Sequence, residues 1–190
     1  MSTNNGVLRT KKAMKQALIS LLQEKELREI TISEIMSRAE YSRATFYAHF
    51  QFKEDLLDEV FQELITGFSE AFRAPYANSK EPFDVKQLTA SAVHVFDYIY
   101  RHETVFAILC KSSSLGFQER LGDVLKNIYT RDYDTLFPQM PPHINRELFV
   151  NHAVYTMLGM IDYWVESQFT YSAKYMTDQL IAIAKLQHLY

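Results

Sequence analysis

The sequence TISEIMSRAEYSRATFYAHF, residues 31–50, contains the signals for two short helices separated by a tight turn. Thr31 and Glu34 have the spacing of a capping box, in which the threonine oxygen and the glutamate satisfy each other's orphan backbone amides. This spacing predicts a helix that begins after Thr31 and directs Ile35 and Ala39 toward a core.

The next three residues, EYS at 40–42, interrupt that helix and predict a turn. Ser42 is a good N-cap for a second short helix over residues 43–50. Within it, Phe46 and Phe50 lie four residues apart and share one face, which is the pattern of a buried helix face. The other faces of this helix are expected to be exposed to solvent.

A longer helix is predicted on each side of the pair. Thr10 can cap the first one after a polar stretch, residues 1–9, that we expect to be mobile. The helix after the pair is predicted to begin near Lys53 and to stop before Pro75. Two short helices joined by a three-residue turn, with a helix on each side, are the architecture of a helix-turn-helix module.

A helix-turn-helix can bind DNA only if the second helix has a free face, because the major groove admits an object of that size. Donors at its edges must also hold phosphates to fix the register. The sequence supplies five such side chains, namely Arg43, Thr45, Tyr47, His49 and Lys53. The helix N-terminus near Phe52 can add backbone amides aimed at a phosphate. A basic arm can reach the backbone or an adjacent minor groove, and it consists of Arg9, Lys11 and Lys12.

The charge distribution is uneven, although the net charge of the chain is only −3. Residues 1–53 contain nine basic and five acidic side chains, a balance of +4, which leaves −7 for the rest. A basic head on an acidic body favours a polyanionic partner at the head. An ordinary solvated surface explains the same excess almost as well, so the charge alone decides little.

The residues quoted above, followed by KEDLL at 53–57, strongly resemble the TetR/AcrR (tetracycline-repressor) family. The resemblance is specific over about residues 10–60, where the run TFYAHF combines core and phosphate-facing positions; over the remainder it is only architectural. It implies an all-α protein. An N-terminal three-helix DNA-binding domain would cover 1–52, and a C-terminal helical domain for dimerisation and effector binding would cover 53–190, with the helix from about 53 as the connection.

The resemblance also implies roles for individual residues. Bases would be faced by Arg43, Ala44 and Thr45, phosphates would be held by Tyr47, His49 and Lys53, and Phe46 and Phe50 would be core. The full set of residues predicted to contact DNA is Ser42, Arg43, Ala44, Thr45, Tyr47, His49, Lys53, Thr31 and Lys11.

Three residues depart from the family pattern. Glu40 stands where glycine is usual, at a position that often needs a positive φ, so it implies strain or a different turn. Tyr41 replaces a small aliphatic residue and must find space or a hydrogen bond for its hydroxyl. Phe52 stands where a capping Ser or Asn is usual, which costs about 1 kcal/mol of capping.

The remaining two thirds of the chain predict further helices, at about 84–101, 103–111, 117–137, 144–167 and 173–189, after a loop at 73–83. Apolar residues recur at helical spacing in the last two, as Phe149, Ala153, Met157, Ile161, Trp164, Met176, Leu180, Ile183 and Ala184. Paired with their symmetry mates, these two helices would form a four-helix dimer interface. The alternative is that they pack within one subunit.

An effector pocket is a further hypothesis for the second domain. Its predicted lining mixes apolar walls with polar tips and consists of His94, Tyr98, Phe106, His152, Met157 and Trp164. The alternative is that these residues are ordinary core. No ligand spacing joins the histidines to Asp, Glu or Cys, so we expect no metal and no cofactor.

Other classes of protein are disfavoured. Apolar residues make up 47% of the chain, and five Gly and five Pro are few for an all-β fold. The single Cys110 fits a reducing cytosol, and we expect a cytoplasmic protein without a signal peptide or membrane span. No Gly-rich phosphate loop or nucleophile elbow is present, so we expect no enzyme.

The sequence therefore predicts a dimeric regulator that binds palindromic double-stranded DNA. We expect a repressor released by a small-molecule or protein effector. The alternative is a helical adaptor of the same fold that has lost DNA reading and binds protein.

Overall fold

The structure is a computed structural model that describes residues 2–77, 84, 89, 93–138 and 140–187. These residues form ten α-helices and no strand, which confirms the all-α fold. The chain divides into two compact units, Met1–Leu64 and Ile65–Tyr190, and each is described by itself. The division falls within the long helix α4, Lys53–Ala77.

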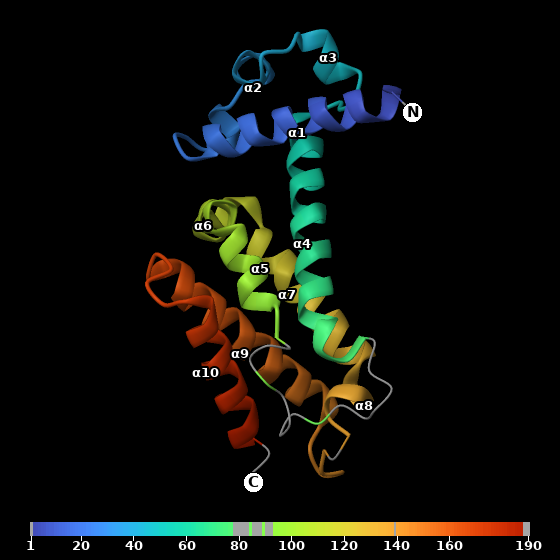
Figure 1. The fold of residues 1–190 in the computed structure, drawn as a ribbon, viewed down its shortest axis with the longest axis vertical. Helices are drawn as coiled ribbons and strands as arrows, with labels where there is room; N and C mark the ends of the chain where they lie inside the picture. The colour runs from blue at the N-terminus through green and yellow to red at the C-terminus, as the bar shows by residue number, and fades with distance from the viewer. Residues whose placement is uncertain (1, 78–83, 85–88, 90–92, 139, 188–190) are drawn as a thin grey trace. The chain divides into compact units, whose positions relative to one another are not determined.

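The first unit contains three helices before the start of α4 (Figure 1), namely α1 (Ser2–Leu22), α2 (Ile32–Ala39) and α3 (Arg43–Tyr47). Helix α2 packs against α1, and α3 packs against α2. Their shared core includes Met14, Leu18, Ile35, Phe46 and Phe61, each of which is at most 1% exposed. The two short helices and the turn predicted between them are present, but the second helix ends at Tyr47 and not at Phe50 as predicted.

Helix α1 differs from the sequence-based prediction, because it begins at Ser2 and not after Thr10. The Thr10 hydroxyl does not cap the helix; it donates to the Gly6 carbonyl, 3.0 Å away, one turn earlier. Threonine in mid-helix commonly satisfies its hydroxyl in this way. The prediction of a mobile segment over residues 1–9 is therefore wrong from residue 2 onward.

Helix α4 continues through Pro75, where the sequence predicted its end. Proline removes one backbone donor and crowds the preceding turn, but only two residues of the helix follow Pro75. The cost is therefore confined to the last turn, and residues 73–77 of the predicted loop are helical. Residues 78–83 of that predicted loop lie outside the described residues.

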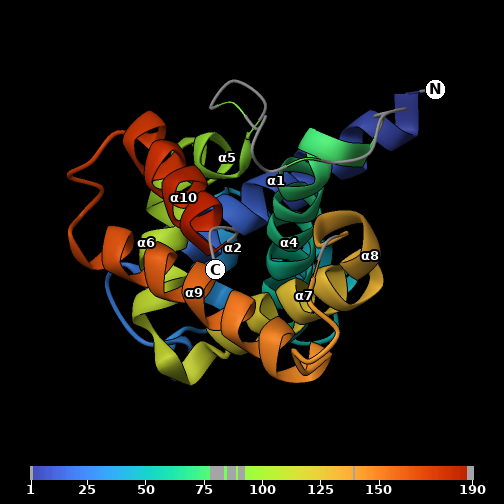
Figure 2. The same ribbon diagram turned by 90° about the horizontal axis from the view of Figure 1, so that it is seen from below.

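The second unit contains six further helices (Figures 1 and 2), namely α5 (Val95–Arg101), α6 (Glu103–Lys111), α7 (Phe117–Arg131), α8 (Tyr133–Leu136), α9 (Arg146–Glu166) and α10 (Ala173–Gln187). Helix α6 has the bounds that the sequence predicted. The helix predicted over 117–137 is broken at Asp132, whose φ of −97° and ψ of 17° are not helical. The helix predicted over 84–101 begins only at Val95, since Val93 and His94 are not helical, and most of the first half of the prediction lies outside the described residues.

Helix α9 is the centre of the second unit. It packs against α6 and α7, while α10 packs against α5. Its inward stripe is Val150, Val154, Met157, Ile161 and Trp164, all at most 6% exposed. Over the described residues, none of the helices has the length and apolarity of a membrane span, and no three potential metal ligands gather.

Candidate DNA-binding site

The N-terminus of α2 has the capping box that its sequence predicted. The Glu34 amide donates to the Thr31 hydroxyl oxygen at 3.2 Å, and the Thr31 amide donates to the Glu34 carboxylate at 2.9 Å. Glu34 also forms an ion pair with Lys25 at 2.5 Å. The hydrogen bond from Lys25, together with the two from Thr31, lowers the pKa of Glu34 to about 2. The Thr31 hydroxyl, predicted to contact DNA, is occupied by this cap.

The turn between α2 and α3 keeps the left-handed geometry that usually calls for glycine. Glu40 has φ 61° and ψ 36°. The Tyr41 amide donates to the Met36 carbonyl at 3.0 Å, which closes the C-terminus of α2 in the manner of a Schellman motif. The departure at residue 40 therefore produces backbone strain and not a different turn. Tyr41 is accommodated half-buried beside it.

Helix α3 has one buried and one exposed face. Ser42 caps it by accepting from the Thr45 amide at 3.2 Å, and its hydroxyl is 2.9 Å from that of Thr45. Phe46 is fully buried, and Phe50 packs against it with ring centroids 5.6 Å apart. The exposed face carries Arg43, Ala44 and Tyr47, and His49 is half-buried just beyond the helix. This is the surface that a major groove requires.

The start of α4 is capped by a residue that the sequence analysis missed. The Asp55 carboxylate accepts from the amides of Gln51 and Phe52 at 3.0 and 2.8 Å. This is the half of a capping box in which the third helical residue reaches back to the cap position; Phe52 itself, 57% exposed, has no side-chain acceptor for the amides of the first turn. These two amides are therefore engaged within the protein and are not free for a phosphate. An acidic residue three positions after the cap position was the available signal.

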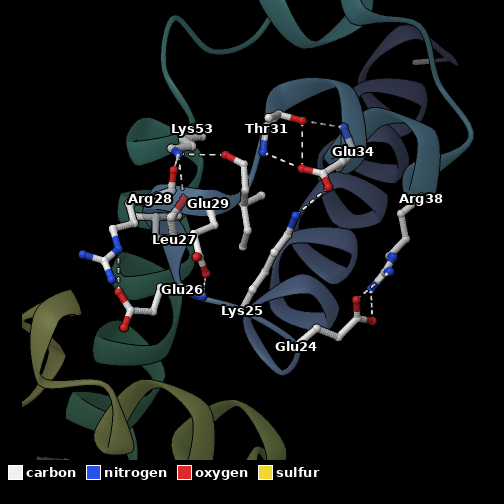
Figure 3. Close-up of polar contacts among 11 residues, drawn as sticks. Glu24, Lys25, Glu26, Leu27, Arg28, Glu29, Thr31, Glu34, Arg38 and Lys53 are labelled. Atoms are coloured by element: carbon white, nitrogen blue, oxygen red, sulfur yellow. Dashed lines mark hydrogen bonds and ion pairs between the residues drawn. The ribbon is translucent and has the colours of Figure 1, made fainter.

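Lys53, predicted to hold a phosphate, has a different set of partners (Figure 3). Its ammonium group donates to the carbonyls of Leu27 and Ile30, both at 2.7 Å, and of Arg28 at 3.4 Å. All three belong to the segment between α1 and α2. No local pattern predicts this contact, because the partners are carbonyls 23–26 residues away.

Lys11, also predicted to contact DNA, is engaged on the side of α4. It forms an ion pair with Glu59 at 2.7 Å and lies over the ring of Phe50, 4.9 Å from the centroid. Lys15 joins the same cluster through Glu59 and Glu63. These contacts attach α1 to α4 within the first unit.

Few basic side chains of the first unit remain available for an external anion. Of its nine, five are in ion pairs, namely Lys11, Lys15, Lys25, Arg28 and Arg38. Lys53 is bound to carbonyls. Among the residues that the structure describes, the three without an ion pair or side-chain hydrogen bond are Arg9, Lys12 and Arg43. Two lie on α1 and the third opens α3.

The residues predicted to line an effector pocket are divided by the structure. Phe106, Met157 and Trp164 are fully buried, whereas His94 and His152 are exposed. Tyr98 is half-buried, with its ring 6.4 Å from that of Phe106. The Trp164 indole donates to the Tyr171 carbonyl at 2.9 Å. Three of the six are thus core side chains, and the effector role of the set stays a prediction.

Two of the hollows on the described part of the second unit are lined by none of those six residues. One of about 650 Å³ lies between α7 and α9 beside Gly122, Gly159 and Asp162. The other, of about 400 Å³, lies between α9 and α10. Its aromatic lining consists of Tyr155, Tyr163, Tyr171 and Tyr175.

Four residues of the apolar stripes predicted as a dimer interface turn inward instead, while Phe149, Ala153, Leu180, Ile183 and Ala184 are half-buried. Met157, Ile161, Trp164 and Met176 are at most 4% exposed within the single chain. They cannot also meet a partner, so the alternative of packing within one subunit holds for them. A second stripe is exposed on α9 and α10 and consists of Leu148, Tyr155, Tyr163, Tyr175 and Leu186, each 45–73% exposed.

The fold and the exposed face of α3 define a helix-turn-helix protein. Two family matches give the class more closely. Residues 16–60 match the family described as "Bacterial regulatory proteins, tetR family", and residues 86–186 match a "Transcriptional regulator C-terminal region" of the same family. The chain belongs to the TetR family of transcriptional regulators, as its sequence indicated.

Individual relatives are distant. The chain is 18% identical over 182 residues to the "Uncharacterized HTH-type transcriptional regulator YxbF" of Bacillus subtilis (strain 168). That match covers 93% of this chain but spans only 45% of YxbF, which is thus much the longer protein.

Solved structures show the same fold. A TetR-family regulator of Syntrophomonas wolfei has a TM-score of 0.74 at 15% identity, covering 95% of each chain. A TetR regulator of Streptococcus agalactiae 2603V has a TM-score of 0.66 at 20% identity, covering 97% of this chain and 98% of that one. The fatty acid degradation regulator FadR of Bacillus halodurans scores 0.67 at 16% identity, covering 92% and 94%.

Proposed function

We propose that this protein is a dimeric repressor that binds palindromic operator DNA through α3 and is released by an effector. The observation that carries the proposal is the surface of α3. Phe46 holds the helix to its unit, while Arg43, Ala44 and Tyr47 stay exposed around it. Among the described residues no partner is found for the Arg43 guanidinium, which is therefore available for a base edge.

The phosphate contacts are proposed at Arg9 and Lys12 of α1, which have no partner within the described part of the chain, together with the Tyr47 and His49 side chains at α3. Ser42 and Thr45 complete the surface at the N-terminus of α3. Lys11 and Lys53 are excluded from the proposed surface, because their ammonium groups are already bound within the protein.

The geometry of the turn supports DNA reading over the adaptor alternative. The adaptor depended on an altered turn at Glu40, and that residue keeps the left-handed conformation. Helix α3 is thus presented as a glycine would present it, at a cost in strain alone. We retain the adaptor as the outcome that a failure to bind DNA would indicate.

The dimer is proposed to form through the exposed stripe of α9 and α10. Exposed apolar patches of this kind mark interfaces, and tyrosine is enriched in them. A dimer also presents α3 twice, as two half-sites of a palindrome require. Members of this family typically form homodimers.

DNA binding is tested with the duplex that lies upstream of the protein's own gene. Affinity is measured by fluorescence anisotropy at several salt concentrations. Each phosphate neutralised contributes about −0.9 to the slope of log affinity against log salt, so a steep slope is expected. No binding to any duplex in dilute buffer would refute the proposal and favour the adaptor.

Base reading is tested by Arg43→Ala against Arg28→Ala, a matched loss of one exposed arginine in the same unit. Arg43→Ala is expected to relax specificity by about 1–3 kcal/mol if the guanidinium makes a bidentate base contact. Arg28, already paired with Glu26, should leave discrimination unchanged. Equal discrimination by both variants would remove Arg43 from the base-reading residues.

The dimer is tested by Tyr155→Glu, which places a charge in the exposed stripe. Sedimentation should show a dimer for the unmodified protein and a monomer for the variant, since a buried unpaired charge is costly. Asn127→Glu, on the exposed side of α7, is the control and should stay dimeric. A monomeric unmodified protein would exclude this part of the proposal.

A further inference from the structure

Three side-chain contacts attach the segment between α1 and α2, residues 23–31, to its neighbours (Figure 3). Arg38 of α2 donates to Glu24 at 2.7 Å. It also donates to Ser20, at the end of α1, at 2.9 Å. Lys25 pairs with Glu34 at the start of α2. The third contact comes from α4, through Lys53, and is the only one of these three that reaches the carbonyls of the segment's backbone.

The contact of Lys53 uses the full capacity of its head group. A lysine ammonium has three donors and no acceptor. It meets three acceptors, the carbonyls of Leu27, Arg28 and Ile30, where the short helix Leu27–Glu29 ends. Carbonyls at a helix C-terminus are short of intrahelical partners and favour a cation, although the carbonyl of Leu27 also accepts from the Ile30 amide. The ammonium group therefore has an acceptor for each of its donors, and the carbonyls at the end of that helix gain a donor.

We propose that Lys53 is a positioning residue of the DNA-binding unit: its ammonium group fixes the segment 23–31 to the start of α4 and does not bind phosphate. The inference rests on the proposed function only for its DNA readout. We call this contact between Lys53 and the three carbonyls the clamp. Because α2 begins where the segment ends, the clamp sets where α2 and hence α3 lie on α4.

Two observations oppose a phosphate at Lys53. Turning the ammonium group outward would take the ammonium partner from the part-buried Ile30 carbonyl and leave the Leu27 carbonyl with the Ile30 amide alone, and an unsatisfied polar group is costly there. The Asp55 carboxylate also lies at the amides of Gln51 and Phe52, directly before Lys53. A negative charge at that place repels a phosphate that would approach the same helix end.

The experiment compares Lys53→Met with Lys12→Met. Both variants lose one positive charge from the first unit, but Lys12 is exposed and unpaired among the described residues. Three quantities are measured in the full-length protein: the salt dependence of operator binding, the melting temperature, and the hydrogen exchange of the Glu29 and Ile30 amides. Those two amides are bonded to the carbonyls of Glu26 and Leu27 and so report on the segment directly.

The clamp predicts opposite results for the two variants. Lys53→Met should keep the salt slope, lower the melting temperature and accelerate exchange at Glu29 and Ile30 at least tenfold. Lys12→Met should make the slope shallower by about 0.9 and leave melting and exchange unchanged. A shallower slope for Lys53→Met with unchanged exchange would overturn the proposal.

Lys53→Arg covers the case in which Lys53→Met does not fold. Arginine keeps the charge, but its planar fork cannot place three donors around one nitrogen as an ammonium does. The clamp predicts faster exchange at Glu29 and Ile30 in this variant, whereas a phosphate contact predicts unchanged exchange and full affinity. If the unmodified protein binds no DNA, the exchange measurements still decide the clamp, while the proposed function fails separately.

Discussion

Each of the two units is stabilised internally by a different kind of contact. In the first unit, ion pairs and hydrogen bonds link one segment to another, as in the pairs Lys11–Glu59 and Arg38–Glu24. In the second unit, rings pack on rings. The chain of neighbouring rings runs through Phe72, Tyr129, Phe137 and Phe149, with centroids 4.7–6.1 Å apart.

The difference follows from the lengths of the helices and from what each must leave exposed. Helix α3 has five residues and must keep one face free for a ligand, so it can bury little apolar area. Charged contacts between neighbouring segments supplement that small core. Helix α9 has 21 residues and can devote a whole stripe to the interior. The first unit is therefore expected to be the more sensitive to charge, and the second to packing.

The largest effect is expected from truncating one buried ring in each unit. Phe46→Ala and Phe106→Ala each empty a fully buried position, at a cost of about 3–5 kcal/mol. Because the units have separate cores, hydrogen exchange should rise only within the unit that carries the change. Phe46→Ala should abolish DNA binding while the protein stays dimeric.

The two variants serve as controls for each other. If Phe46→Ala accelerates exchange in the helices of the second unit as much as in the first, the two cores behave as one. The contrast drawn between the units would then lose its basis.

A smaller effect is expected at Asp132, the main polar anchor of the second unit. Its carboxylate accepts from Arg73 and Tyr76, both at 2.9 Å, and from Arg131 at 3.1 Å. Burial raises its pKa, but these donors outweigh burial and the net pKa is lowered. Asp132→Asn should cost about 1–3 kcal/mol in urea unfolding, because two part-buried donors lose their partner.

The control for Asp132 is Asp134→Asn, since that side chain is 90% exposed and lies 3.8 Å from Arg146. The free energy of unfolding of Asp134→Asn should equal that of the unmodified protein within experimental error. An equally small loss at Asp132 would mean that packing alone holds the C-terminal part of α4 in its unit.

The helix-turn-helix could be predicted from sequence because its signals are local. The capping box at Thr31, the cap at Ser42 and the pair Phe46 and Phe50 all act over three or four residues, and the structure has each of them. Lys53 could not be placed in this way, because its partners lie in a different segment. A lysine exposed to a phosphate and a lysine bound to distant carbonyls have the same sequence context.

The second unit shows where periodicity reaches its limit. Helical spacing in α9 correctly marked an apolar stripe that includes Met157 and Trp164, but it could not tell burial within the chain from burial against a partner. The exposed stripe on Leu148 and Tyr155 has the same period on another face. Which face turns inward depends on α6 and α7, and the spacing within α9 contains no information about them.

Relieving the backbone strain at Glu40 should have a smaller effect, and this change should raise the free energy of unfolding. A left-handed conformation costs a residue with a Cβ about 1–2 kcal/mol, while glycine loses part of that advantage through its freer unfolded chain. Glu40→Gly should therefore stabilise the first unit by about 1 kcal/mol in urea unfolding and leave DNA affinity intact. Glu40→Ala keeps the strain and should give no such gain; equal stabilisation by both would place the cost in the glutamate side chain.

The smallest effect tests whether the charged contacts of the first unit stabilise it at all. The pKa of Glu34 in the folded protein is about 2, below its ordinary value of 4.5. A lowered pKa gives stability that is fully present above the ordinary value and is lost as the pH falls toward 2. Glu34→Gln keeps a side chain that can complete the capping box but removes the ion pair with Lys25. Its free energy of unfolding should lie slightly below that of the unmodified protein at pH 7, and the gap should close between pH 4.5 and 2. Lys25→Met, which removes the other partner, should reproduce that closing gap. A difference that does not change with pH in either variant would show that the ion pair contributes nothing, and the first unit would then depend on its small core and its caps.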